Sequence, residues 1–184
     1  MKNIYSLAML TFFACRLSAQ NMPEYNNSAI VWNSKANISV QLSPEETVRK
    51  DKLNSAYKIP YGALFSKKAV VKTTLQLQGP KSKARTAAED TLKIYAKIDK
   101  DVNPLGIFKI YRATIENNNR EVQVMQTSKK GNVDRSDGDF QYTIDKIAAG
   151  IFLVKVVGPK SGDELFFYIG THETPMAKLT LGID

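Results

Sequence analysis

The chain has a single histidine, His172, in the sequence GTHE at residues 170–173. A metal site needs several converging ligands, and a general base needs a nucleophile or a substrate within reach. The sequence offers no second histidine, and the neighbouring residue types are typical of a loop between strands. We therefore interpret His172 as a solvated loop residue, and we expect no catalytic residue, no metal and no cofactor.

The densest run of oxygen-bearing side chains lies between Asn132 and Asp139. Calcium loops alternate such residues and end with a bidentate glutamate. In this run Gly138 comes two positions late, and Thr143 stands where that glutamate would be. The run is therefore interpreted as a polar hairpin loop.

Basic residues gather between Lys67 and Lys100, and Tyr95 lies among them. Nucleic-acid-binding proteins combine such patches with stacking aromatic residues, but Glu89 and Asp90 dilute this one. A solvated face of two strands is the simpler interpretation, and we expect no nucleic-acid partner. The candidate binding surface that remains comprises Lys81, Lys83, Arg85, Tyr95 and Arg120.

The first twenty residues have the pattern of a secretory signal peptide. Lys2 precedes an apolar run over residues 4–14, which is too short to span a bilayer as a helix. Residues 1–20 are assigned to this signal, with cleavage after Ala19 as the main interpretation. The alternatives are a lipid-modified Cys15, which would place the protein on a membrane, and an uncleaved anchor.

Charge and cysteine content limit the partners and the chemistry. The 184 residues carry a net charge of +8, and removal of Lys2 and Arg16 with the signal leaves 24 basic and 18 acidic residues. This excess favours anionic surfaces such as acidic glycans or lipid head groups. Cys15 is the only cysteine, so its loss with the signal would exclude disulfides and cysteine-based sites.

Short β-rich runs separated by turn residues predict an all-β fold. Residues 92–98 alternate apolar and polar side chains, and three asparagines at 117–119 predict a hairpin loop between two strands. In the run 151–157 we expect Phe152, Val154 and Val156 to point into the core, opposite to Lys155. About nine strands are expected to form one immunoglobulin-like antiparallel β-sandwich over residues 28–184, after a flexible lead-in at 21–27.

One short N-terminal helix is expected within this sandwich. Ser43 suits an N-cap, Pro44 suits the first helical position, and Glu46 follows the cap by three residues as in a capping box. The helix would end near Leu53. Residues 55–68 are too apolar for a free linker, and they are expected to pack on the sandwich edge.

Five short motifs lie between residues 70 and 184: Gly79, Ser82 and Arg85; Asn103-Pro104; Arg120-Glu121-Val122; Gly150 and Phe152; and Leu181-Gly182-Ile183-Asp184. In these motifs this part of the chain resembles exported bacterial domains of uncharacterised function. Those domains run from a G-x-x-S-x-x-R turn through an N-P-like turn and an R-E-V strand start to an L-P-x-G-E-Y turn and a terminal F-G-I-D. Ala148 and Ile151 depart from the pattern, where a proline and an acid are expected. The resemblance implies a β-sandwich and no activity, and IAAGIFLVKV also resembles a strand entry of immunoglobulin-like domains.

The expected function is that of a non-catalytic binding or structural module of the cell envelope or the extracellular space. Its partner would be an envelope protein or a glycan. The alternatives are an accessory subunit of an envelope assembly and a small periplasmic hydrolase, although no base converges on the serines of the sequence. The expected location is the periplasm or the exterior, or the outer membrane if Cys15 carries a lipid.

Overall fold

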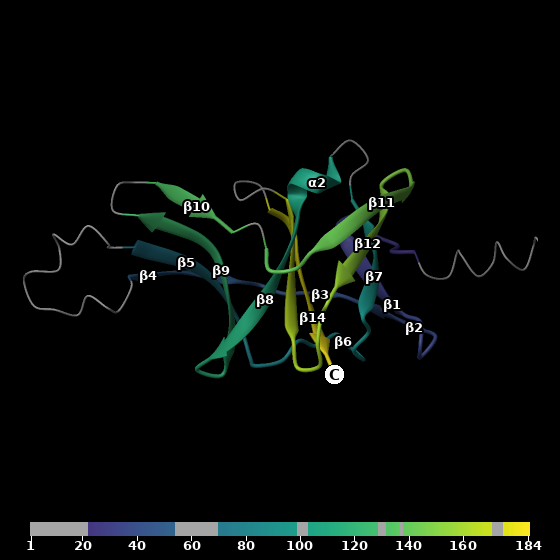
Figure 1. Cartoon of the computed structure of the whole chain (residues 1–184), viewed down its shortest axis with the longest axis horizontal. Coiled ribbons are helices and arrows are strands. Elements are labelled where there is room, and N and C mark those ends of the chain that lie inside the picture. The colour runs from purple at the N-terminus through teal and green to yellow at the C-terminus, as the bar shows by residue number, and fades with distance from the viewer. Residues whose placement is uncertain (1–21, 54–69, 99–102, 129–131, 137, 171–174) are drawn as a thin grey trace, which may run out of the picture.

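The computed structural model describes residues 22–53, 70–98, 103–128, 132–136, 138–170 and 175–184. Within these residues the elements are strands, apart from one helical turn, α2 (Pro104–Ile107). Two antiparallel sheets pack face to face as a sandwich (Figure 1). The predicted all-β antiparallel sandwich is therefore confirmed. No helix in the described part of the chain is long and apolar enough to cross a bilayer.

The smaller sheet has the strand order β11-β12-β7-β1-β2. Its strands are β1 (Ser28–Asn33), β2 (Ile38–Gln41), β7 (Thr91–Lys97), β11 (Tyr142–Ala148) and β12 (Ile151–Val157). The larger sheet has the order β3-β14-β13-β8-β9-β5-β4, with β10 added to β9 and β6 added in parallel to β14. Its strands are β3 (Ser43–Pro44), β4 (Val48–Leu53), β5 (Val70–Leu77), β6 (Arg85–Thr86), β8 (Phe108–Glu116), β9 (Asn119–Ser128), β10 (Val133–Arg135), β13 (Glu164–Gly170) and β14 (Pro175–Ile183).

The main core lies between the two sheets. Phe152, Val154 and Val156 of β12 are buried there, as predicted, while Lys155 on the opposite face ion-pairs with Asp145. The strand register places these three β12 residues beside Ala96, Ile94 and Leu92 of β7, which are also fully buried. The alternation of side chains along the two strands thus builds one wall of the core.

A second, smaller core lies on the other face of the larger sheet. Strands β8 and β13 alternate between the two cores: Phe167 faces the main core, whereas Tyr111 and Phe166 join Leu77 and Val122 in the smaller one. Every residue of β13 is buried as a result. A strand that is covered on both faces has a nearly continuous apolar sequence, and β13 has such a sequence after its first residue.

The larger sheet curls, because its two edge strands are close neighbours in sequence. β3 and β4 lie at opposite ends of the strand order, yet only residues 45–47 separate them. A connection of this length spans at most roughly 14 Å. The two edges must therefore approach each other around the smaller core.

The predicted helix from Ser43 to Leu53 is wrong. Ser43 pairs with Thr180 of β14, and β4 pairs with β5. The carboxylate of Glu45 binds side chains of β9 and β14, and its N–H donates to the carbonyl of Lys178. Pairing with distant strands has overridden a local capping signal.

The predicted hairpin around the asparagines is confirmed, with a tighter turn than expected. Asn119 belongs to β9, so the turn consists of Asn117 and Asn118, which have φ angles of 50° and 62°. Positive φ at both central residues is the requirement of a type I′ turn, in which Asn-Gly is a preferred pair.

Two substitutions at Asn118 are expected to differ in their effect on stability. Asn118→Gly is expected to change the free energy of unfolding by less than about 1 kcal/mol, because glycine adopts positive φ without strain. Asn118→Val is expected to lower it by ~1–2 kcal/mol, because a β-branched residue is strained in this conformation. Urea melts followed by circular dichroism measure both values, and equal stability of the two variants would contradict the turn geometry.

Candidate binding site

The structure brings together four of the five residues predicted as a binding surface. Lys81, Lys83 and Arg120 line one pocket, and Arg85 lies in a network of buried polar residues beside it. Tyr95 does not belong to this site, because it lies on β7, on the face opposite to the main core. His172, Cys15 and residues 1–20 lie outside the described part of the chain.

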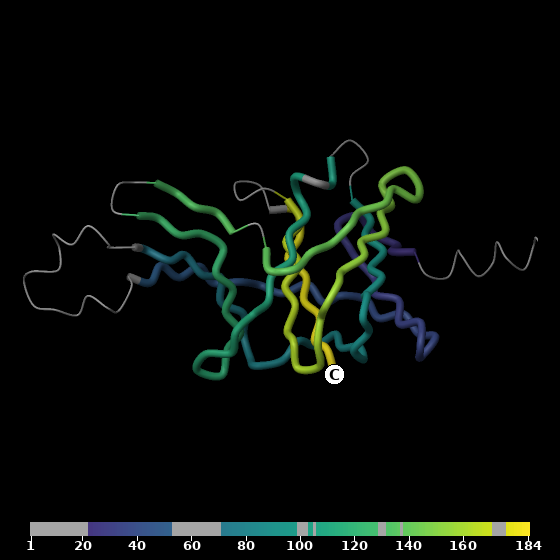
Figure 2. The backbone as a smooth tube through the Cα atoms, in the orientation of Figure 1, coloured from purple at the N-terminus to yellow at the C-terminus, as the bar shows by residue number. Residues whose placement is uncertain are grey.

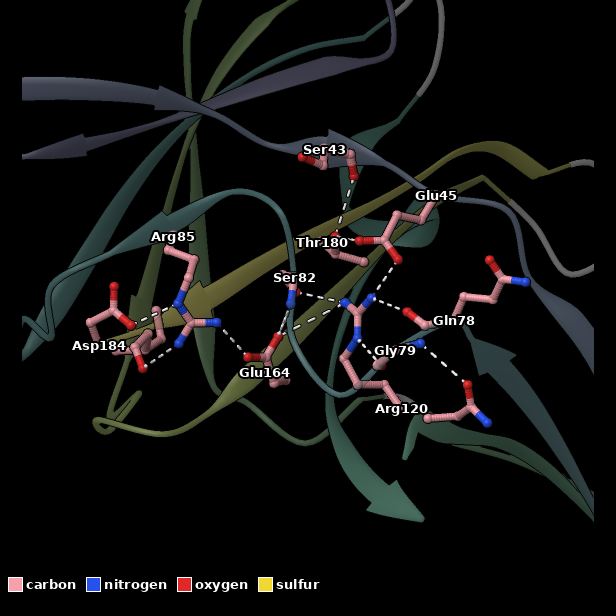
Figure 3. Close-up of polar contacts among 12 residues, drawn as sticks. Ser43, Glu45, Gln78, Gly79, Ser82, Arg85, Arg120, Glu164, Thr180 and Asp184 are labelled. Atoms are coloured by element: carbon pink, nitrogen blue, oxygen red, sulfur yellow. Dashed lines mark hydrogen bonds and ion pairs between the residues drawn. The ribbon is translucent and has the colours of Figure 1, made fainter. Parts of the chain in front are cut away.

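Arg120 is the centre of the network. It starts the inward-facing row of β9 that continues with Val122, and only 1% of its surface is exposed. Its Nη2 donates to Glu45 Oε2 at 2.5 Å and to the carbonyl of Gln78, and Nε donates to the carbonyl of Gly79 (Figure 3). Each nitrogen of this guanidinium has a partner, which is the condition for burying an arginine without a large desolvation penalty.

Glu164 is the second buried charge, at the start of β13. Its Oε2 accepts two hydrogen bonds from Ser82, from the backbone N–H at 2.8 Å and from Oγ at 2.5 Å. The Oγ of Ser82 in turn accepts a bond of 2.7 Å from Arg120 Nη1. Ser82 therefore connects the two charged residues, whose own Nη1–Oε2 distance is 3.9 Å.

Arg85 extends the network to the last strand. Its Nη1 donates to Glu164 Oε1 at 2.7 Å, and its Nε donates to Asp184 Oδ1 at 2.7 Å. The hydrogen bond with Glu164 raises the pKa of Arg85 above its usual range, and the bond with Asp184 adds to this. The close approach requires glycine at position 182, since a Cβ there would lie 2.2 Å from Arg85 Nη1.

Glu45, which follows the edge strand β3 of the larger sheet, also belongs to the network. Its Oε1 accepts a hydrogen bond of 2.6 Å from the hydroxyl of Thr180, while its Oε2 binds Arg120. The segment that joins β5 to β7 contains Gly79, Ser82 and Arg85, and it passes the end of the sandwich at which the C-terminus lies (Figure 2). The network thus fastens this segment to β9, β13 and β14.

The hydrogen bonds of Ser82 determine whether its hydroxyl group could act as a nucleophile. A serine beside a carboxylate is one arrangement for nucleophilic catalysis. However, Ser82 is only 4% exposed, its hydroxyl hydrogen is directed to Glu164, and its oxygen accepts from Arg120. The hydroxyl is therefore held as a structural link rather than presented to a substrate.

Residues quoted for the resemblance to exported bacterial domains meet in this network. Gly79, Ser82, Arg85, Arg120 and Asp184 come from three separate parts of the sequence and lie within one set of hydrogen bonds (Figure 3). Arg85 and Arg120 were predicted on one candidate surface, but the sequence did not indicate that Ser82 and Asp184 join them. Glu45 and Glu164 were missed, although the two acids Asp163 and Glu164 directly before the apolar run of β13 were an available signal.

A pocket of about 400 Å³ adjoins the network. Its lining residues are Pro44, Glu45, Glu46, Val48, Gln76, Gln78, Lys81, Lys83 and Arg120. Glu45 Oε2 and Arg120 Nη2 lie 2.5 Å apart and form an ion pair, so their charges neutralise each other. Among the described residues, the side chains of Glu46, Lys81 and Lys83 form no hydrogen bond or ion pair with the protein, and all three are exposed. The pocket therefore combines a fixed inner wall with three free charges.

A second, more open pocket of about 540 Å³ lies beside the first. It shares Pro44, Glu45 and Glu46 with the first and is completed by Thr47, Met176, Ala177 and Lys178. Its lysine is already engaged, because Lys178 Nζ donates to Thr47 Oγ1 at 2.8 Å. The first pocket thus offers more unused polar groups to a ligand.

Another group of charged side chains lies on the larger sheet, away from this pocket. Lys52 of β4 binds Glu116 of β8 and Glu121 of β9 at 2.7 and 2.5 Å, and these two hydrogen bonds raise the pKa of Lys52. Within the described ranges, no three histidine, cysteine, aspartate or glutamate side chains gather as metal ligands.

Neither a model of a protein family nor the sequence of a curated protein matches this chain. The resemblance to exported bacterial domains therefore stays a prediction.

Proposed function

We propose that the chain is an exported, non-catalytic module that binds an envelope protein or a glycan through the pocket between residues 44–48 and 76–83. The observation that carries the proposal is the contrast within this pocket. Its inner wall is held by buried charges that are all paired, whereas Glu46, Lys81 and Lys83 at its surface have no partner among the described residues. A binding site is more precise when its interacting groups are carried on a rigid support.

Preorganisation supports this function. Binding costs less when the groups that meet the ligand are already fixed. Lys81 and Lys83 flank Ser82, which is fastened to Glu164 and Arg120, so the backbone that carries both lysines is held in place. Their ammonium groups remain free to adjust to a partner.

Export is the part of the proposal that rests on sequence alone. The basic and apolar pattern of residues 1–20 supports it, and the two outcomes kept open are cleavage after Ala19 and lipidation of Cys15. The alternative of a small hydrolase draws no support from Ser82, because the hydroxyl of this residue is buried and fully bonded.

Site-specific photo-cross-linking tests the proposal in the cells that produce the protein. Benzoylphenylalanine at position 78, where the exposed Gln78 side chain lines the pocket, is expected to give adducts of higher mass with a partner. The matched control places the same group at Lys93, an exposed position on the outer face of β7. Adducts from position 78 alone would support the pocket. Their absence, or the same adducts from both positions, would contradict it.

A further inference from the structure

The free groups of this pocket define the chemistry of its ligand. Glu45 and Arg120 cancel, so Glu46, Lys81 and Lys83 leave one net positive charge facing the pocket. This balance suits an anionic ligand that places one carboxylate between the two lysines. The adjacent carboxylate and amide, Glu46 and Gln78, are in turn acceptors for hydroxyl hydrogens.

The remaining lining adds apolar contact and limits the size. Val48 is 62% exposed, and Pro44 is also exposed, so both can pack against carbon–hydrogen groups of a ligand. A volume of about 400 Å³ lies in the range of small-molecule sites. The lining therefore suits a compact, hydroxylated and anionic ligand with one apolar face.

We propose that this pocket binds an acidic saccharide, with a sugar carboxylate between Lys81 and Lys83 and sugar hydroxyl groups donating to Glu46 and Gln78. The inference rests on the proposed function and narrows it to the glycan alternative. An envelope protein as the sole partner is thereby an opposing outcome. Charge-assisted hydrogen bonds from the two ammonium groups supply the stronger contacts, and the hydroxyl contacts distinguish a sugar from a simple anion.

The test is a titration of the isotope-labelled protein followed by NMR. The probes are tri-galacturonic acid, maltotriose as a neutral trisaccharide of the same length, and inorganic phosphate as a plain anion. Tri-galacturonic acid is expected to shift the amide signals of Val48, Gln78, Lys81 and Lys83, and to bind at least tenfold more tightly than either of the other probes. Equal binding of maltotriose or of phosphate would overturn the inference, and so would the absence of binding at millimolar concentration.

Paired variants assign the effect to the two lysines. The double variant Lys81→Gln/Lys83→Gln is expected to weaken binding of tri-galacturonic acid at least tenfold. The control Lys93→Gln/Lys160→Gln removes the same charge from two exposed positions that do not line the pocket, and it is expected to change affinity less than twofold. Equal losses in both double variants would show diffuse attraction by the positive protein and would overturn the inference. Unchanged thermal melts confirm that each variant folds.

The saccharide inference and the proposed function fail in different ways. If position 78 still gives its cross-linked adduct in the Lys81→Gln/Lys83→Gln variant, another kind of partner occupies the pocket. The saccharide inference is then overturned while the binding function stands. If position 78 gives no adduct in either background, the binding function itself fails.

Discussion

Phe152→Ala is expected to leave the protein largely unfolded. The phenylalanine is 3% exposed and lies in the main core, beside Ala96 of the neighbouring strand. Truncating a buried phenylalanine costs ~3–5 kcal/mol, a large share of the ~5–15 kcal/mol that stabilises a typical domain. Urea denaturation followed by far-UV circular dichroism, compared with the unmodified protein, measures this loss.

The control for this prediction lies three residues along the same strand. Lys155 points away from the core, and its ion pair with Asp145 joins two side chains that are 41% and 55% exposed. Exposed pairs of this kind contribute little, so Lys155→Ala is expected to cost less than ~1 kcal/mol. If Lys155→Ala were the more damaging change, the inward face of β12 would be the opposite one.

Arg120→Met is expected to cost ~3–5 kcal/mol, the typical loss when one partner of a buried ion pair is removed. The variant would leave the carboxylate of Glu45 without its cation and would orphan the carbonyls of Gln78 and Gly79. Methionine fills much of the volume of the arginine stem, so the loss reports on polar groups rather than on a cavity. A urea melt gives the change in the free energy of unfolding.

The same substitution at an exposed arginine provides the matched control. The side chain of Arg49 is 62% exposed, and its Nε lies 3.5 Å from Asp51 Oδ1. Because such exposed ion pairs contribute little, Arg49→Met is expected to change the free energy of unfolding by less than ~1 kcal/mol. A loss of similar size in both variants would mean that the buried network does not stabilise the fold. A loss confined to Arg120→Met would establish the network as a structural fastening of the wall behind the pocket.

Local sequence patterns predicted those strands whose surroundings repeat regularly. In β7 and β12, alternate residues face a core, so the period of two is visible in the residue types. The Asn117–Asn118 turn was predictable because asparagine tolerates positive φ. In each of these cases the physical cause lies within a few residues of the effect.

The helix at Ser43 and the position of Tyr95 were mispredicted because their causes are distant. Nothing near Ser43 indicates that its strand pairs with residues of β14 at the other end of the chain. Likewise, a high density of lysines predicts exposure but not which lysines share a pocket. Lys81 and Lys83 lie in the connection after β5 and line one pocket with Glu46, which lies between the edge strands β3 and β4. Tyr95 lies on the other sheet.

The hydrogen bonds of the buried network also constrain the order in which the fold can form. The bond between Thr180 and Glu45 joins residues 135 positions apart, and the bond between Arg85 and Asp184 joins residues 99 apart. Closing such long loops costs chain entropy before any contact is gained, and Arg120 and Glu164 lose hydration if they are buried before their partners arrive. These charges should therefore remain in water until β14 docks. Closure of the network becomes a final step of folding that a chain without its last strand cannot complete.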